Sequence, residues 1–303
     1  MIPFVRHMRF AYGAVQRVSP LIRRVVARNP GPFTYTGTGA HIVGHGQVAV
    51  IDPGPDQDSH LEAILEATRG ETVSHIFVTH SHLDHSPLAR PLADATGAAI
   101  YACGLPCRPS DGHARLEAGD DLTFRPDAAL TDGRQFRGPG WTIEAVATPG
   151  HTSNHYAYGL VEENALFPGD CVMGWSTSVV SPPDGDMGDY LASLRKIGDR
   201  RYETLWPAHG PPIREVGPFL DAYVAHRERR AASVLHTLNR RGPMTVRQLV
   251  ADLYADVDRR LHPAAAHTVL AHLIQLVREG EVDCADIPSL AAVFAPARLQ
   301  QVA

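Results

Sequence analysis

The run Thr79-His80-Ser81-His82-Leu83-Asp84-His85 constrains this chain more than any other feature of the sequence. It follows the apolar residues 75–78, which read as a buried strand, so the run lies where that strand ends. Because side chains alternate across extended chain, His80 and His82 point the same way. Asp84 and His85 follow where the chain turns. Imidazole and carboxylate groups are zinc ligands, so the run predicts a metal site.

Three further metal-capable side chains follow short apolar segments in the same manner. His151 comes after residues 141–146, Asp170 after residues 165–166, and His209 after residues 204–206. In each case a Gly/Pro turn stands beside the ligand. A rigid sheet fixes the groups at its strand ends while the loops stay open. The sequence therefore predicts one site that is built from several strand ends.

This pattern resembles the metallo-β-lactamase superfamily, which has His-x-His-x-Asp-His followed by His, Asp and His at later strand ends. The resemblance implies a four-layer αββα sandwich. It also implies that His80, His82 and His151 bind one metal ion, that Asp84, His85 and His209 bind a second, and that Asp170 bridges them. Residues 28–34 (RNPGPFT) and 181–187 (SPPDGDM) are similar to the branch of β-lactamase-like protein 2, which includes an endoribonuclease.

Details of the motif separate the chemistries within this superfamily. The common β-lactamases have Cys at one ligand position, whereas this chain has Asp170, and Cys171 is expected to point away from the metals. Diiron oxygen reductases of the fold have Glu where this chain has His82. The single-iron sulfur dioxygenase branch stays open. Because imidazole suits iron as well as zinc, we expect two zinc ions without excluding iron or manganese.

The expected reaction is hydrolysis by a hydroxide that bridges the two metals, since a pair of ions lowers the pKa of a shared water toward ~7. Asp84 is expected to bind the second metal and to aim this hydroxide. His155 is a candidate for the general acid or a substrate contact; the alternative is a half-buried histidine at the start of a strand. Asp52 lies where the fold often has an aspartate behind the metal loop, which orients ligands.

Composition is that of an ordinary globular protein, with 44% hydrophobic and 20% charged residues and a net charge of −5. No apolar run reaches the ~20 residues of a membrane span. The 4 cysteines predict free thiols in a reducing compartment, the cytoplasm. Before Asp52 there is no acidic residue. This arginine-rich start has three interpretations: a transit peptide, a solvated strand face, or a basic platform for an anion such as RNA.

The apolar spacing predicts a hairpin over residues 39–44 and 47–52, and helices over 59–68, 88–96 and 188–198. After about residue 217 the pattern changes to three helices, over 219–239, 246–254 and 262–279, with a turn and short strand after Gly280. We therefore predict a catalytic domain over residues 1–217 and a winged-helix-like domain over 218–303. The second domain either packs over the active site or forms a homodimer, or it grips nucleic acid.

The function predicted from these features is a dinuclear zinc hydrolase that cleaves single-stranded RNA. A thioester, ester or lactone hydrolase with weak β-lactam hydrolysis uses the same chemistry and is the first alternative. The second alternative is a metal-dependent regulator whose winged helix binds DNA. The expected partner is an anionic or acyl substrate, with no membrane.

Overall fold

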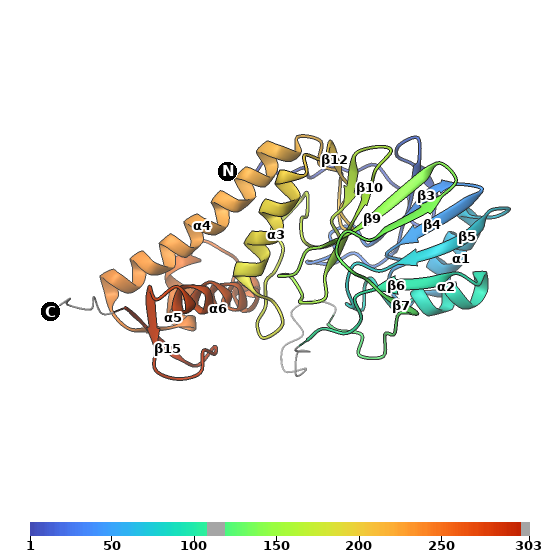
Figure 1. The fold of residues 1–303 in the computed structure, drawn as a ribbon. Helices are drawn as coiled ribbons and strands as arrows, with labels where there is room; N and C mark the ends of the chain where they lie inside the picture. Colours follow the sequence, from blue (N-terminus) through green and yellow to red (C-terminus); the bar gives the residue numbers. More distant parts are fainter. Residues whose placement is uncertain (108–118, 298–303) are drawn as a thin grey trace.

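Two sheets lie face to face at the centre of the molecule in the computed structural model, which describes residues 1–107 and 119–297 (Figure 1). The first sheet has seven strands in sequence order, antiparallel up to β4 and parallel from β4 onward. Its strands are β1 (Gln16–Arg17), β2 (Ile22–Val26), β3 (Gly39–His45), β4 (Gln47–Ile51), β5 (Thr72–Phe77), β6 (Ala99–Ala102) and β7 (Ala128–Ala129).

The second sheet has five strands in the order β12-β11-β10-β9-β8. Its strands are β8 (Gln135–Gly138), β9 (Trp141–Ala147), β10 (Tyr156–Leu160), β11 (Ala165–Phe167) and β12 (Thr204–Leu205). Side chains of both sheets meet in a core between them that includes Phe77, Trp141 and Tyr158. Trp141 Nε1 donates to the carbonyl of Gln47 at 2.9 Å, which ties the two sheets together.

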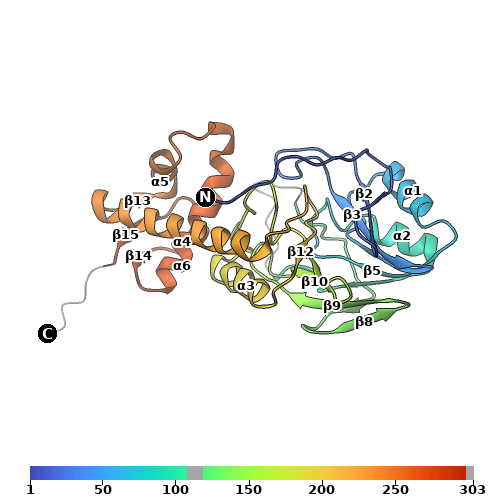
Figure 2. The ribbon, with the colours of Figure 1, turned by 90° about the horizontal axis from the view of Figure 1, so that it is seen from above.

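Helices cover the outer face of each sheet (Figure 2). Helices α1 (Asp58–Ala67) and α2 (Ala89–Thr96) pack on the first sheet through Ile64 and Leu92. Helices α3 (Met187–Asp199) and α4 (Val216–Arg241) pack on the second sheet. The layers therefore run helix, sheet, sheet, helix, and the predicted four-layer αββα architecture is confirmed.

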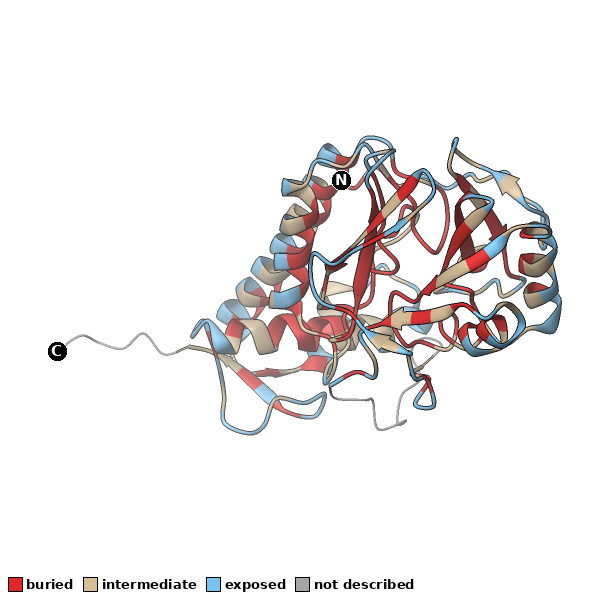
Figure 3. Ribbon diagram, turned by 45° about the vertical axis from the view of Figure 1, so that its right-hand side comes forward, coloured by how far each residue is buried: buried red, intermediate tan, exposed pale blue. Residues whose placement is uncertain are grey.

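The predicted elements are present, with small shifts at their ends. The apolar residues expected on one face of the third helix (Tyr190, Leu191, Leu194 and Ile197) are all buried. Asp186 caps this helix by accepting from the backbone N–H groups of Gly188 and Asp189. Buried residues concentrate in the strands and on the inner helix faces (Figure 3).

The C-terminal region contains three helices and a small sheet, which is the predicted winged-helix arrangement. After α4 come α5 (Val246–Leu253), the 3₁₀ turn η1 (Arg259–Leu261) and α6 (His262–Arg278). The sheet has the order β13-β15-β14, with β13 (Met244–Thr245), β14 (Val282–Cys284) and β15 (Val293–Pro296). Thr245 and Gln248 form a capping box that starts α5.

Helix α4 joins the two regions, because it begins in the core of the second sheet and ends in the core of the winged helix. It starts at Val216, three residues before the expected start at Phe219, and so it crosses the predicted boundary between residues 217 and 218. The boundary itself stays a prediction.

Two arginines of the N-terminal segment belong to the fold. Arg23 pairs with Glu71 at 2.6 Å, and Arg24 is buried beside Gln16 and the carbonyl of Gly210. Both lie on β2, whose register with β3 makes it an integral strand. These two side chains are neither a solvated strand face nor a surface for an anionic partner.

Candidate metal centre

The histidine-rich motif forms a buried loop after β5, and Asp52 holds it in place. The carboxylate of Asp52 accepts from the backbone N–H of Thr79 at 2.7 Å and from its hydroxyl at 2.8 Å. A second contact joins Asp52 Oδ2 to His85 Nδ1 at 3.0 Å. Asp52 has φ of 50°, a strained conformation for a residue with a side chain. This strained aspartate therefore fixes both the loop and the orientation of one candidate ligand.

His80, His82 and His151 lie together as the first candidate ligand group, which is the grouping that the family resemblance implied. Their ligand nitrogens lie within 4.8 Å of one another. Val179 O accepts from His151 Nδ1 at 2.7 Å, and Thr79 Oγ1 lies 3.0 Å from His80 Nδ1. These contacts engage the Nδ1 atoms of His80 and His151 and leave Nε2 as the ligand atom of these two rings.

Asp84, His85 and His209 form the second group, and Asp170 lies between the two. His209 Nε2 lies 3.2 Å from Asp84 Oδ2 and 3.4 Å from Asp170 Oδ1. The other oxygen of Asp170, Oδ2, lies 4.0 Å from His151 Nε2. Asp170 thus presents one oxygen to each group, which is the geometry that a bridging carboxylate requires. We call the end of the sheets where these seven side chains meet the metal edge.

Several ligand atoms of the metal edge are buried without a well-formed hydrogen bond to a described residue, and this burial tests whether metal ions fit. The Nε2 atoms of His80, His85 and His209 and Oδ1 of Asp170 have no well-formed hydrogen bond to any residue that the structure describes. An unsatisfied buried polar group costs about 1–3 kcal/mol. Bound cations would satisfy these atoms, so the donor set fits two divalent ions.

The charges of the metal edge also favour cations. Burial opposes ionisation of Asp84, but His85 and His209 outweigh it and lower the pKa of Asp84 to about 2. Burial likewise opposes a charged His209, yet Asp170 and Asp84 raise its pKa to about 10. Burial and the neighbouring His151 lower the pKa of His82 to about 3, which keeps that imidazole neutral as a ligand must be.

Both ring nitrogens of His155 make contacts inside the protein. Its side chain is fully buried, and Thr148 Oγ1 lies 2.8 Å from Nδ1 while the backbone N–H of Asp170 donates to Nε2 at 3.2 Å. Because Nε2 accepts a hydrogen bond, the proton is on Nδ1. The half-buried alternative is corrected, because the side chain is fully buried, while the role as general acid or substrate contact stays a prediction. His155 positions the backbone that carries Asp170.

The ring of His155 packs so closely against residue 169, the neighbour of Asp170, that this position requires glycine. A Cβ at Gly169, where φ is 51°, would lie 2.7 Å from His155 Nε2. Cys171, on the other side of Asp170, is buried in the apolar core under α3 and is absent from the ligand groups found among the described residues. The chain thus places one of two neighbouring residues at the metal edge and the other in the core.

Sequence reasoning missed three supports of the site. Asp184 accepts from the backbone N–H of Ser153 at 2.8 Å and so braces the loop of His151. Val179 supplies the carbonyl for His151, and Asp120 Oδ1 lies 3.7 Å from His82 Nε2. Asp184 lies in the segment 181–187, which carried only a family resemblance. Neither Asp120 nor Val179 has a sequence signal, because each acts through long-range contacts.

With this geometry in place, comparisons with known proteins define the class. Residues 40–209 match the protein-family model of the metallo-beta-lactamase superfamily, and residues 245–287 match the beta-lactamase associated winged helix domain. The chain belongs to the metallo-β-lactamase superfamily, a family of metal-dependent hydrolases, and it carries the winged-helix domain associated with it. In the part of the chain that the structure describes, no helix is long and apolar enough to cross a membrane.

Among its relatives, the Beta-lactamase-like protein 2 homolog of Caenorhabditis elegans is 30% identical over 89% of this chain and 88% of that protein. An atrochrysone carboxyl ACP thioesterase of Claviceps purpurea is 30% identical over 80% of this chain and 74% of that protein. A beta-lactamase domain protein from Burkholderia ambifaria has a TM-score of 0.78 at 22% identity, covering 98% of this chain and 97% of that one. This last likeness shows the fold.

Proposed function

We propose that this protein is a dinuclear zinc hydrolase of activated acyl compounds, with a thioester as substrate. The relative named an ACP thioesterase supports an acyl substrate. Five histidines and two aspartates form a donor set that suits zinc, and iron suits it as well. The four free cysteines fit a reducing compartment such as the cytoplasm.

The chemistry divides between the ions and the protein. Two divalent ions in this site would activate a water as nucleophile and polarise the acyl carbonyl. The chain holds its ligands rigidly, through Asp52 behind His85, Val179 behind His151 and His155 behind Asp170. In the overall reaction a C–O bond forms from water and the C–S bond breaks. Of the two protons of that water, one ends on the thiolate at neutral pH and the other is released to the solvent, which leaves the acid product as a carboxylate.

The engagement of His155 is the observation that carries the choice of leaving group. Both ring nitrogens of this histidine are hydrogen-bonded within the protein, so it has no proton to give to a substrate. A thiol has a pKa near ~8.5 and leaves readily as the thiolate, without a proton donor. The sugar oxygen that leaves on RNA cleavage is far more basic. Because the candidate general acid, His155, has both ring nitrogens engaged within the protein, the site suits a thioester better than RNA.

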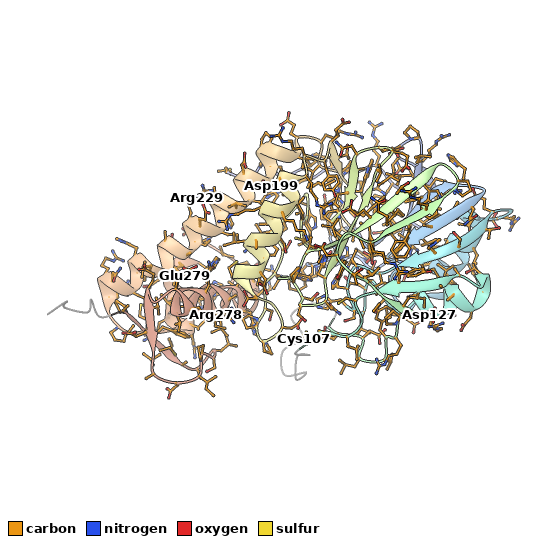
Figure 4. The ribbon with its side chains drawn as sticks, in the orientation of Figure 1. Cys107, Asp127, Asp199, Arg229, Arg278 and Glu279 are labelled. Carbon is orange, nitrogen blue, oxygen red and sulfur yellow. The ribbon has the colours of Figure 1, made fainter. Side chains whose placement is uncertain are left out.

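Charge and packing support this choice over the two nucleic-acid functions. The net charge is −5, and Arg23 and Arg24 are used inside the fold, which weakens the case for a polyanion. The third helix of a winged helix reads DNA when it lies in a groove. Here that helix, α6, is largely buried against α4, and its Arg278 pairs with Asp186 of the catalytic region (Figure 4).

The test compares thioester and RNA substrates directly. Zinc-loaded protein and His209→Ala are assayed with acetyl and decanoyl thioesters of N-acetylcysteamine and with a labelled single-stranded RNA. We expect thioester hydrolysis by the wild type and none by His209→Ala, which excludes contaminating enzymes. RNA cleavage that depends on His209, without thioester hydrolysis, would overturn the proposal.

A further inference from the structure

A pocket of about 360 Å³ lies between the catalytic region and the winged helix. Its walls come from segments that are far apart in the chain: the N-terminal Phe4, the loop of Phe33, residues 173–179, and helices α4 and α6. The volume is at the lower end of the ~300–1,000 Å³ of small-molecule pockets. A pocket built from so many segments exists only when the two regions are packed together.

One wall of this pocket is formed by residues that also support the metal edge. Residues 173–179 follow closely after Asp170, and Val179 at their end holds His151 through its carbonyl at 2.7 Å. Trp175 lies against the residue after His209, since a Cβ at Gly210 would be 2.9 Å from its ring. One wall of the pocket thus contacts supports of both ligand groups. The pocket therefore lies next to the metal edge, on the side of the winged helix.

The side chains that line the pocket favour a ligand that is mostly apolar and carries oxygen atoms as hydrogen-bond acceptors. Aromatic and aliphatic side chains make up most of it, among them Phe4, Phe33, Trp175 and Leu261, and Tyr35 stacks on Trp175 with ring centroids 4.9 Å apart. The charged groups in the lining are basic. Arg230, partly exposed, lies over the ring of Tyr254 at 4.4 Å. Apolar walls with a few polar groups are typical of ligand pockets, and a guanidinium pairs with carbonyl or carboxylate oxygens.

We propose that this interdomain pocket binds the acyl group of the substrate and selects an apolar acyl chain or ring that bears oxygen acceptors. The proposal rests on the proposed acyl hydrolysis and deepens it, because it assigns the winged helix a part in choosing the substrate. The winged helix then acts as a wall of the active site rather than as a nucleic-acid module.

The experiment fills the pocket and measures both turnover and binding. Ala264 on α6 lines the pocket, and Ala264→Phe narrows it. Ala266, two residues along the same helix, lines a separate hollow on the winged helix, so Ala266→Phe is the matched control. We expect Ala264→Phe to lower kcat/KM for the decanoyl thioester at least ~10-fold relative to the acetyl thioester. Ala266→Phe should leave this ratio unchanged.

Binding is measured without turnover, by the change in tryptophan fluorescence when decanoate is added. We expect a saturable change that disappears in Trp175→Phe and in Ala264→Phe but remains in Ala266→Phe. Val257→Trp, on another wall, is the second filling variant in case Ala264→Phe does not fold. If the protein bound decanoate saturably but hydrolysed no thioester, the proposed function would be refuted, while the pocket would stand as a binding site for such a chain. The proposed role of the pocket would be refuted if the filled variants hydrolysed the decanoyl and acetyl thioesters with the same kcat/KM ratio as the wild type and if decanoate caused no change in fluorescence.

Discussion

Two regions of this protein bury histidine ring nitrogens that lack a well-formed hydrogen bond to a described residue, in opposite electrostatic settings. At the metal edge, carboxylates face the imidazoles, and they raise the pKa of His209 to about 10 against the effect of burial. Between α4 and α6, both ring nitrogens of His272 are buried without a hydrogen bond to any described residue. Burial, and then Arg227, His226 and Arg230, lower the pKa of His272 to about 3.

The comparison shows that buried imidazoles alone do not make a metal site. The carboxylates of the metal edge attract a cation, whereas the arginines around His272 repel one. The first region carries a cost in unsatisfied polar atoms that a bound ion would remove. In the second region the unsatisfied ring nitrogens of His272 carry the same kind of cost, and no cation is attracted there to remove it.

The largest expected effect comes from removing the bridging charge. Asp170→Asn takes away the carboxylate that faces both ligand groups, so we expect metal content to fall below two ions per chain and turnover to fall by more than ~100-fold. Metal is counted by mass spectrometry of the purified protein. Full activity with two bound ions would show that Asp170 does not bridge.

A smaller loss of metal affinity is expected when Asp52, which holds the candidate ligand His85 in place, is changed. Asp52→Asn keeps the size of the side chain but weakens the hold on His85 and Thr79, and it should lower metal affinity about 10- to 100-fold. Competition with a chelator measures this affinity. The matched control is Asp199→Asn, at the exposed end of α3 (Figure 4). Equal affinities in the two variants would contradict the role of Asp52.

The second region is tested by the effect of pH on the free energy of unfolding. Since His272 has a pKa of about 3 in the folded state and 6.5 as its ordinary value, the unfolded chain binds the proton more readily between these values. Its contribution to stability is complete above pH ~6.5 and is lost as the pH falls, by about 2 kcal/mol at pH ~5.

His272→Leu should therefore lose less stability than the wild type between pH 7 and pH 5, by about 2 kcal/mol. Urea unfolding of the metal-free proteins at both pH values gives this difference. His236→Leu, at an exposed position on α4, is the control. A wild type and a His272→Leu variant with the same pH dependence would show that His272 becomes protonated inside the folded protein without penalty.

The smallest effect on metal binding is expected at Cys171, the residue after the proposed bridging ligand Asp170. Cys171 is buried, and burial raises the pKa of its thiol to about 12, so it is a poor source of thiolate for a metal. Cys171→Ala should keep the metal content of the wild type and cost about 1 kcal/mol of stability. Loss of metal from this variant would mean that the ligand assignment is wrong.

Much of the fold followed from local patterns in the sequence. Apolar spacing predicted the six helices with small errors at their ends, because each helix buries one face. The hairpin of β3 and β4 was predicted from two apolar runs, which are buried on both faces. The short strands β1, β7 and β13 have two residues each and no periodicity of their own. They form where a neighbouring strand offers a pairing edge, which a single-sequence pattern does not show.

By itself, the sequence determined which residues belong to the metal edge. Each of the seven lies in a loop that follows a strand (β5, β9, β11 or β12), and a sheet brings such positions together. The tertiary structure decided what their neighbours do. It placed His155 against the backbone of Asp170, paired Arg23 and Arg24 with groups inside the fold, and closed a pocket between α4, α6 and residues 173–179. These outcomes depend on contacts between distant segments, whose geometry is fixed only when the layers pack.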